Sequence, residues 1–257
     1  MTPTFHSDLQ NKVLHLRFGQ PGQRNLMDDA WFDALEAHLA QADADPAVRV
    51  VLLSAEGDAF CAGANLKSVQ HGLLAEGYER SALARLLQRL TRLGKPLVAA
   101  VHGLAIGGGS TLLLHCDFVY AAQGTRFQMP FTRLGLVPEF GSSYLLPLSA
   151  GMRLASQIVL LGEPFDAETA LRAGLVTQVT PADQALAHAR QTAEALAQLA
   201  PAPVAAAKRL LRQGHAAALQ AALAAEGEAL QASLQSPELA EAVTAFIEKR
   251  APDFARF

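Results

Sequence analysis

Two glycine-containing loops are the places in this sequence where backbone groups could do chemistry. They are GDAFCAGANLKS, residues 57–68, and HGLAIGGGSTLLL, residues 102–114. Each follows an apolar run of strand length and precedes a helical pattern, which predicts a position at the carboxyl edge of a parallel sheet, where ligands bind. Helix N-termini there present unpaired N–H groups, and glycines let a substrate approach them closely. Two such N–H groups aimed at one point would form an oxyanion hole.

Both loops also have simpler interpretations. Glycines at the ends of strands are often plain turns or points of tight packing, so neither loop alone establishes a function. Phosphate binding is a competing function. GGGST lacks the Gly-Lys-Ser/Thr ending of a P-loop, and IGGGST lacks the spacing of the dinucleotide fingerprint.

The elements that must position the loops alternate between strands and helices. The apolar and alternating runs predict strands over residues 11–18, 48–54, 95–103 and 117–122. Helical spacing of apolar residues predicts helices over 28–43 and 76–93, and GGGSTLLLHC opens another helix. Strands that alternate with helices predict right-handed βαβ units around a parallel sheet.

The last third of the chain has a different pattern. Only helices are expected there, over residues 181–199, 202–214, 218–233 and 237–249. The sequence therefore predicts an α/β core over residues 1–195 and a C-terminal helical segment over residues 196–257, for which we expect a role in oligomerisation.

Composition narrows the function classes. Hydrophobic residues make up 51% of the chain and charged residues 18%, as in an ordinary globular protein. The net charge of −3 provides no basic field for a nucleic acid. Two cysteines cannot form a disulfide framework, and no metal-ligand spacing occurs. The polar start has no signal-peptide pattern, and no apolar run reaches membrane-spanning length, so we expect a cytoplasmic protein without a membrane partner.

Five segments follow one another in an order that resembles a known family. They are AFCAGANLKS, KPLVAAVHGLAIGGGSTLLLHCDFVYAA, FQMPFTRLGLVPEFGSSYLLP, AGLVTQV and AFIEKRAPDF. The series resembles the enoyl-CoA hydratase/isomerase family, also called the crotonase superfamily, over nearly the whole chain. The resemblance implies an α/β fold, a crotonase-like spiral of βαβ units with a C-terminal helical segment. It also implies a homotrimer or dimer of trimers that acts on acyl-CoA in fatty acid metabolism.

The resemblance also assigns roles to residues. It places the two N–H donors at Ala64 and Gly108. Coenzyme A is implied as part of the thioester substrate, with no separate cofactor. Its adenine would lie against the backbone of Ala62 and Leu66, and its phosphates near Arg24 and Lys67. The C-terminal helix of a neighbouring subunit often helps in this family. The remaining substrate-site candidates are Asn65, Gly107, Thr111, Phe131, Phe246 and Lys249.

Two positions depart from the hydratase pattern. Hydratases of this family hold water with two glutamates, one shortly after the glycine triplet and one in a QPE-like segment. Here these positions are Thr111 and Phe131, and neither side chain is a general base near neutral pH. Ordinary two-carboxylate hydration is therefore not expected.

One acid remains at a position that distinguishes reactions within the family. Glu139 follows Pro138, where the hydratases have glycine and Δ3-Δ2-enoyl-CoA isomerases, notably the peroxisomal type, have a similar Pro-Glu. Its apolar neighbours in the sequence predict desolvation and a raised pKa suited to proton transfer. The structural alternative is that Glu139 caps the helix starting near Gly141.

We therefore expect a Δ3-Δ2-enoyl-CoA isomerase that moves a double bond by proton transfer through Glu139. Three further enzyme activities of the family stay open: hydratase, ring-opening isomerase and thioesterase. A non-catalytic acyl-CoA-binding protein is the alternative from another class. His102, His115 and Asp117 are expected to be structural, because a satisfied histidine in the core and a hydrogen-bonded aspartate at the start of a strand are common.

Overall fold

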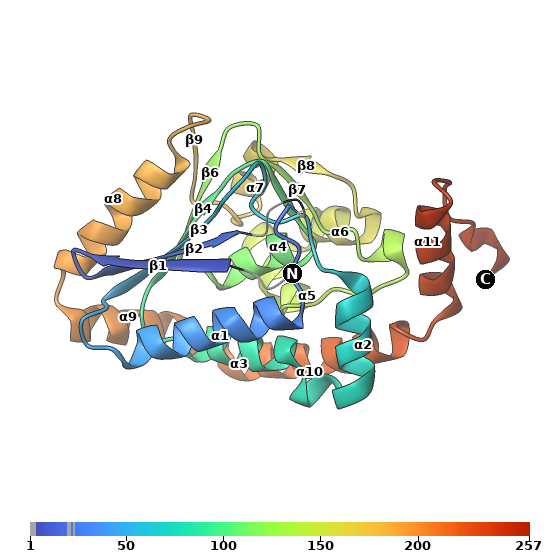
Figure 1. The fold of residues 1–257 in the computed structure, drawn as a ribbon, viewed down its shortest axis with the longest axis horizontal. Coiled ribbons are helices and arrows are strands. Elements are labelled where there is room, and N and C mark those ends of the chain that lie inside the picture. Colours follow the sequence, from blue (N-terminus) through green and yellow to red (C-terminus); the bar gives the residue numbers. More distant parts are fainter. Residues whose placement is uncertain (1–3, 20–21, 23) are drawn as a thin grey trace.

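The computed structural model describes residues 4–257 except residues 20, 21 and 23 and the side chain of Phe246. Its main sheet has six strands in the order β1-β2-β3-β4-β6-β9 (Figure 1). β1 pairs with β2 in antiparallel fashion, and every later pair is parallel. The strands are Thr4–Gln10, Val13–Gly19, Val50–Ala55, Leu97–Val101, Phe118–Ala122 and Gln178–Thr180.

The central strands are apolar along their whole length because both faces of the sheet are covered. One face carries Leu52 and Val98, which pack against alanines of α8 (Ala185–Gln198). The other face carries Val51 and Leu53, which belong to the main core with α1 (Asp29–Ala44) and α3 (Ala82–Arg92). Figure 1 shows α8 on one side of the sheet and α1 and α3 on the other. The predicted βαβ architecture is confirmed.

A second sheet lies beside the first and was not predicted. It has the order β5-β7-β8, with strands Leu104–Ile106, Arg126–Gln128 and Phe165–Asp166. β5 follows β4 through a turn at Gly103, where a Cβ atom would lie 2.0 Å from the carbonyl oxygen of Asp58. Single bridges pair Cys61 with Ala105 and Ala64 with Met27. The bridge between Cys61 and Ala105 brings the two glycine-containing loops together.

The helices around the loops differ in part from the prediction. The helix expected over residues 76–93 is interrupted at Gly77 and Ser81, because Gly77 has a φ of 77° and Ser81 caps a new helix. The helix after the glycine triplet is a single α-helical turn followed by a 3-10 turn. The elements from here to the C-terminal segment are α2 (Leu66–Glu76), η1 (Tyr78–Arg80), α4 (Gly108–Thr111), η2 (Leu112–His115), η3 (Thr132–Leu134), α5 (Ser142–Ala150), α6 (Met152–Leu161) and α7 (Ala167–Arg172).

The stretch that forms α5 and α6 has a further property. By length and composition alone, Ser142–Leu161 could span a membrane, which the apolar runs of the sequence did not indicate. The chain divides it at Gly151, which has a φ of 73° and is the C-cap of α5. Four of its apolar side chains are exposed, namely Leu148, Met152, Leu160 and Leu161.

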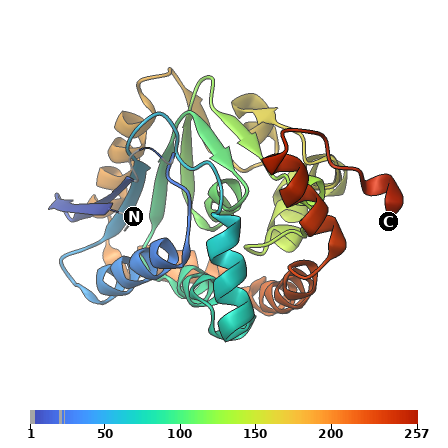
Figure 2. The same ribbon diagram turned by 45° about the vertical axis from the view of Figure 1, so that its right-hand side comes forward.

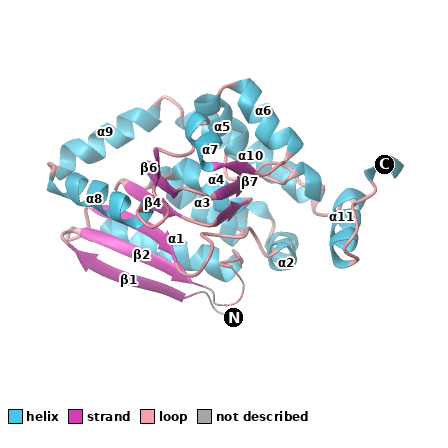
Figure 3. Ribbon diagram, turned by 90° about the horizontal axis from the view of Figure 1, so that it is seen from above, coloured by secondary structure: helices cyan, strands magenta, loops and turns pink. Residues whose placement is uncertain are grey.

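The C-terminal segment folds back onto its own chain. α8 packs on the sheet and ends at Gln198, so it belongs with the core. After it come α9 (Pro201–Gln213), α10 (Ala216–Ser233), α11 (Pro237–Ile247) and the short η4 (Phe254–Arg256). α10 contacts α5 and η1, and α11 contacts η3. Figures 2 and 3 show α11 at one end of the molecule beside the C-terminus.

Candidate active site

Two backbone N–H groups are left unpaired where the glycine-containing loops meet. Met27 donates to the carbonyl of Gly63 and accepts from the N–H of Asn65, which leaves the N–H of Ala64 between them without a bond. The N–H of Gly107 is used by the carbonyl of Gln128. The next N–H, that of Gly108, is the first of α4 and has no partner within the helix. Among the described residues, neither Ala64 nor Gly108 donates a backbone hydrogen bond.

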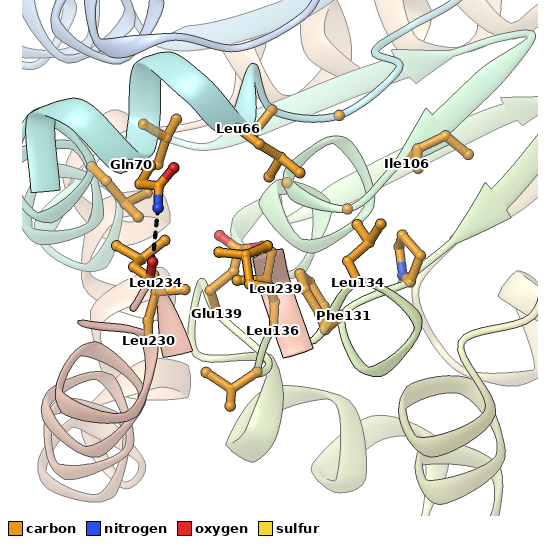
Figure 4. Close-up of a pocket in the computed structure, with 18 of the residues that line it drawn as sticks. Leu66, Gln70, Ile106, Phe131, Leu134, Leu136, Glu139, Leu230, Leu234 and Leu239 are labelled. Atoms are coloured by element: carbon orange, nitrogen blue, oxygen red, sulfur yellow. Dashed lines mark hydrogen bonds between the residues drawn. The ribbon is translucent and has the colours of Figure 1, made fainter. Parts of the chain in front are cut away.

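Ala64 and Gly108 both line one cavity of about 260 Å³. Its walls come from the two loops, from α2, from the segment around η3 and from the C-terminal helices (Figure 4). Most of the lining side chains are apolar, among them Leu66, Phe131, Leu136, Leu230 and Leu239. A concave apolar pocket with a few polar groups is the usual form of a small-molecule site.

Glu139 places a carboxylate in this cavity (Figure 4). Its Oε1 accepts a hydrogen bond of 2.7 Å from the hydroxyl of Thr111. The pKa of Glu139 is raised to about 8, mainly by burial; the hydrogen bond from Thr111 lowers it, and nearby Glu226 also raises it. The predicted desolvation of Glu139 is confirmed, and a carboxyl group with this pKa can both take up and release a proton near neutral pH.

Helix capping does not explain Glu139. The N–H groups of Gly141 and Ser143, at the start of α5, donate to the two carboxylate oxygens of Glu226 at 2.7 and 2.8 Å. Glu226 comes from α10, and sequence reasoning missed it. The only trace it leaves in the sequence is a charged residue beside Gly227 within an apolar helical stretch. Because Glu226 caps α5, the carboxylate of Glu139 is left to face the cavity.

The backbone after Glu139 is held in an unusual conformation. Phe140 has a φ of 58° and is 1% exposed, and Gly141 follows with a φ of 70°. The carbonyl of Phe140 accepts a hydrogen bond of 2.7 Å from Nε2 of His115. Burial lowers the pKa of His115 to about 4, so its ring is neutral and carries its proton on Nε2. The expectation of a structural histidine is confirmed.

The structure brings together most of the predicted binding residues. Ala62, Leu66, Lys67, Gly107 and Phe131 line the cavity with the two N–H donors. Phe131 and Thr111 are buried, and Lys67 is exposed at the start of α2. Thr111 reaches the site through its bond to Glu139.

Among the described residues, Arg24, Asn65, Thr111 and Lys249 are predicted site residues that are not part of the cavity lining. Asn65 caps α2 by accepting from the N–H of Ser68, which is a structural role. Arg24 forms an exposed ion pair with Asp58 at 3.4 Å. Lys249 is exposed, and the side chain of Phe246 lies outside the described part of the structure.

The comparisons with known proteins agree with this geometry. The family model for enoyl-CoA hydratase/isomerase matches residues 8–256. A 2,3-dehydroadipyl-CoA hydratase of Escherichia coli K12 is 38% identical, over 95% of this chain and 96% of the relative. A 1,2-epoxyphenylacetyl-CoA isomerase of the same organism is 32% identical, over 96% of this chain and 97% of the relative.

A solved structure confirms the fold. An enoyl-CoA hydratase/isomerase from Pseudoalteromonas atlantica T6c superposes with a TM-score of 0.91 at 41% identity, covering 97% of this chain and 99% of that chain. With the family match over nearly its whole length, this chain belongs to the enoyl-CoA hydratase/isomerase family and has the crotonase fold of an acyl-CoA-processing enzyme.

Proposed function

We propose that the protein is a Δ3-Δ2-enoyl-CoA isomerase with Glu139 as its proton shuttle. One observation carries this proposal: Glu139 is the only carboxylate among the described residues that line the cavity. A double-bond shift needs one group that removes and returns a proton, and it needs no water. A single carboxylate with a raised pKa, in the same cavity as two free N–H donors, meets that requirement.

The proposed reaction conserves every atom of the substrate. The thioester carbonyl oxygen lies between the N–H groups of Ala64 and Gly108. Glu139 takes a proton from C2, and the electrons of that C–H bond form a dienolate whose oxygen the two N–H groups stabilise. The protonated Glu139 then gives the proton to C4, which leaves the double bond between C2 and C3. Phe131 helps to keep water out of the cavity.

Hydration is the second candidate, because several of the related proteins bear the name hydratase. Thr111 and Phe131 occupy the positions where hydration would need two carboxylates, so the site does not favour hydration. Product analysis separates the two reactions. With 3-enoyl-CoA the isomerase yields 2-enoyl-CoA, and with 2-enoyl-CoA it yields little 3-hydroxyacyl-CoA. Rapid formation of 3-hydroxyacyl-CoA from 2-enoyl-CoA would replace the isomerase proposal with the hydratase.

The reaction should depend on pH through Glu139. The carboxylate must be ionised to accept the proton from C2, and its pKa is raised to about 8. We therefore expect kcat/KM for 3-enoyl-CoA to fall by about tenfold per pH unit below this value and to level off above it. A pH–rate profile of the free enzyme measures this. A profile that is flat between pH 6 and 9 would contradict the assignment of Glu139 as the base.

The phosphates of coenzyme A are expected near exposed cations. Lys67 is exposed and lines the cavity, whereas Lys249 follows α11. Since exposed ion pairs contribute about 1 kcal/mol or less, Lys67→Ala and Lys249→Ala should each weaken acyl-CoA binding measurably, by up to about fivefold, at low salt. Calorimetric titration at two salt concentrations measures this. Unchanged affinity in both variants at low salt would show that the phosphates bind elsewhere.

Assembly into a homotrimer or a dimer of trimers, in the cytoplasm, is also part of the proposal. Apolar side chains on α6 and α9 are left uncovered within one chain, such as Met152, Leu160 and Leu211, which are 69%, 66% and 78% exposed. Exposed apolar stripes of this kind usually need partners. Sedimentation should therefore give the mass of three or six chains, and a stable monomer at micromolar concentration would contradict the assembly.

A further inference from the structure

The described lining of the cavity has almost no polar side chains. Beyond the two N–H donors, the described lining contains three polar side chains, those of Lys67, Gln70 and Glu139. Lys67 is exposed. The amide Nε2 of Gln70 already donates to the carbonyl of Leu234 at 2.7 Å, which ties α2 to the end of α10 (Figure 4). No cation of the described lining is therefore buried within the cavity.

Several of the lining side chains are apolar and well buried. Phe32, Leu83 and Leu230 are 2%, 3% and 6% exposed and come from α1, α3 and α10. An apolar cavity of about 150 Å³ can hold benzene. A cavity of about 260 Å³ therefore has room for an acyl chain of several carbons or for an aryl group.

We propose that the substrate is a 3-enoyl-CoA whose acyl group is uncharged to its far end, aliphatic or aryl-aliphatic, and that acyl groups with a terminal carboxylate are rejected. This inference rests on the proposed function. A terminal carboxylate would lose its hydration among leucines and phenylalanines without meeting a cation. It would also lie in the same low-dielectric cavity as Glu139, which must be ionised to act. The Escherichia coli relative is named for a dicarboxylic acyl group, so the proposal separates this chain from it.

Two thioesters of equal chain length test this. They are 3-hexenoyl-CoA and its analogue with a carboxylate in place of the terminal methyl group. We expect kcat/KM to be lower for the carboxylate by about 100-fold or more, as for a buried unpaired charge. A difference of less than about tenfold would overturn the proposal. In Leu234→Lys, which places a cation at the cavity, the difference should shrink, whereas in Glu228→Lys, on the exposed face of α10, it should not change.

Binding alone keeps this test independent of the reaction. Saturated hexanoyl-CoA and adipoyl-CoA cannot be isomerised, but calorimetry can compare their affinities. We expect hexanoyl-CoA to bind more tightly by about 100-fold. If this preference is found and neither 3-enoyl thioester is isomerised, the proposed isomerase function is wrong, but the proposed specificity for uncharged acyl groups is supported. If adipoyl-CoA binds as tightly as hexanoyl-CoA, the proposed specificity for uncharged acyl groups is wrong, whichever reaction the enzyme catalyses.

A second inference comes from an independent observation, the buried carboxylate of Glu226. Glu226 is 6% exposed, and both of its oxygens accept backbone N–H groups immediately after Glu139 and Phe140. The left-handed backbone of Phe140 costs free energy and persists only where its surroundings enforce it. His115 holds the carbonyl of Phe140 from one side, and Glu226 holds the next N–H from the other.

We propose that Glu226 is a positioning residue that fixes the Glu139 segment, so that the C-terminal helix α10 determines where the proton shuttle lies. This also rests on the proposed function. The groups that face Glu226 are the N–H groups of Gly141 and Ser143 and the hydroxyl of Ser143. Tyr78 of η1, whose ring a Cβ atom at Gly227 would meet, and Glu139 also face it. An amide at position 226 can accept one of the two N–H groups, but its own NH₂ would face the other.

Glu226→Gln tests this with two measurements. We expect kcat to fall by about 10- to 100-fold with little change in KM, since the shuttle is displaced rather than removed. The inflection of the pH–rate profile should also move to lower pH, because the charge of Glu226 raises the pKa of Glu139. Glu228→Gln, two residues along the same helix and exposed, should change neither quantity.

A purely structural role predicts a different pattern for Glu226→Gln. It would lower the melting temperature and leave kcat and the inflection unchanged at temperatures where the protein is folded, and that outcome would overturn the proposal. If Glu226→Gln does not fold, Glu226→Asp keeps the charge with a shorter reach. Glu226→Asp should have a lower kcat and an unchanged inflection in the pH–rate profile. A wild-type kcat in Glu226→Asp would also overturn the proposal. Titration of Glu139 by NMR measures the effect of Glu226 on the pKa of Glu139 without turnover. A failure of the positioning role can therefore be told apart from a failure of the proposed function.

Discussion

Replacing Glu139 by glutamine is expected to preserve acyl-CoA binding and to reduce isomerisation by about 100- to 10,000-fold, the range for one general acid–base group. The amide has the size of the carboxyl group, and its oxygen can still accept the bond from Thr111 that Glu139 receives at 2.7 Å. It cannot take a proton from C2. Single-turnover rates with 3-enoyl-CoA, measured beside calorimetric binding of a saturated acyl-CoA, separate chemistry from affinity.

Stability serves as the control for Glu139→Gln. Because Glu226 caps α5, the substitution removes no cap, and the melting temperature should not fall. Glu228→Gln provides a matched loss of one carboxylate outside the cavity and should keep full activity. An isomerase rate above about a tenth of the wild-type rate in Glu139→Gln would lie outside the range for a catalytic acid–base group. The single-base mechanism would then have to be abandoned.

The parts of the site that could be predicted from the sequence are those that local pattern determines. Ala64 and Gly108 follow strands and precede helices, so their place at the carboxyl edge of the sheet follows from alternation alone. The raised pKa of Glu139 follows in part from its apolar neighbours in the sequence. Resemblance to the family then identified which of the N–H groups are free.

The parts that were missed depend on contacts between distant segments. Glu226 lies 85 residues from Gly141 along the chain, and nothing in the periodicity of α10 indicates which helix it caps. The bond between Gln70 and Leu234 spans 164 residues. The strands of the second sheet have two or three residues each, too short for alternation to be recognised. Such features follow from packing between segments, which one sequence does not encode locally.

The charged cluster at Asp117 anchors the C-terminal segment to the sheet. Asp117 precedes β6, and its two oxygens accept bonds from Lys208 at 2.7 Å and Arg212 at 2.8 Å, both on α9. One oxygen also accepts the backbone N–H of Leu97 at 2.8 Å. The structural role expected for Asp117 is confirmed. Lys208 is 7% exposed, and its burial lowers its pKa, which the charge of Asp117 opposes.

Asp117→Ala is therefore expected to have the largest effect on stability, a loss of about 3–5 kcal/mol, as when one partner of a buried ion pair is removed. The cation of Lys208 would remain buried with only the carbonyl of Lys95 as a described partner, at 2.6 Å. Urea unfolding measures the loss. The control is Glu163→Ala, which breaks an exposed ion pair with Arg133 and should cost about 1 kcal/mol or less. If the two variants lose equal stability, the cluster does not anchor α9.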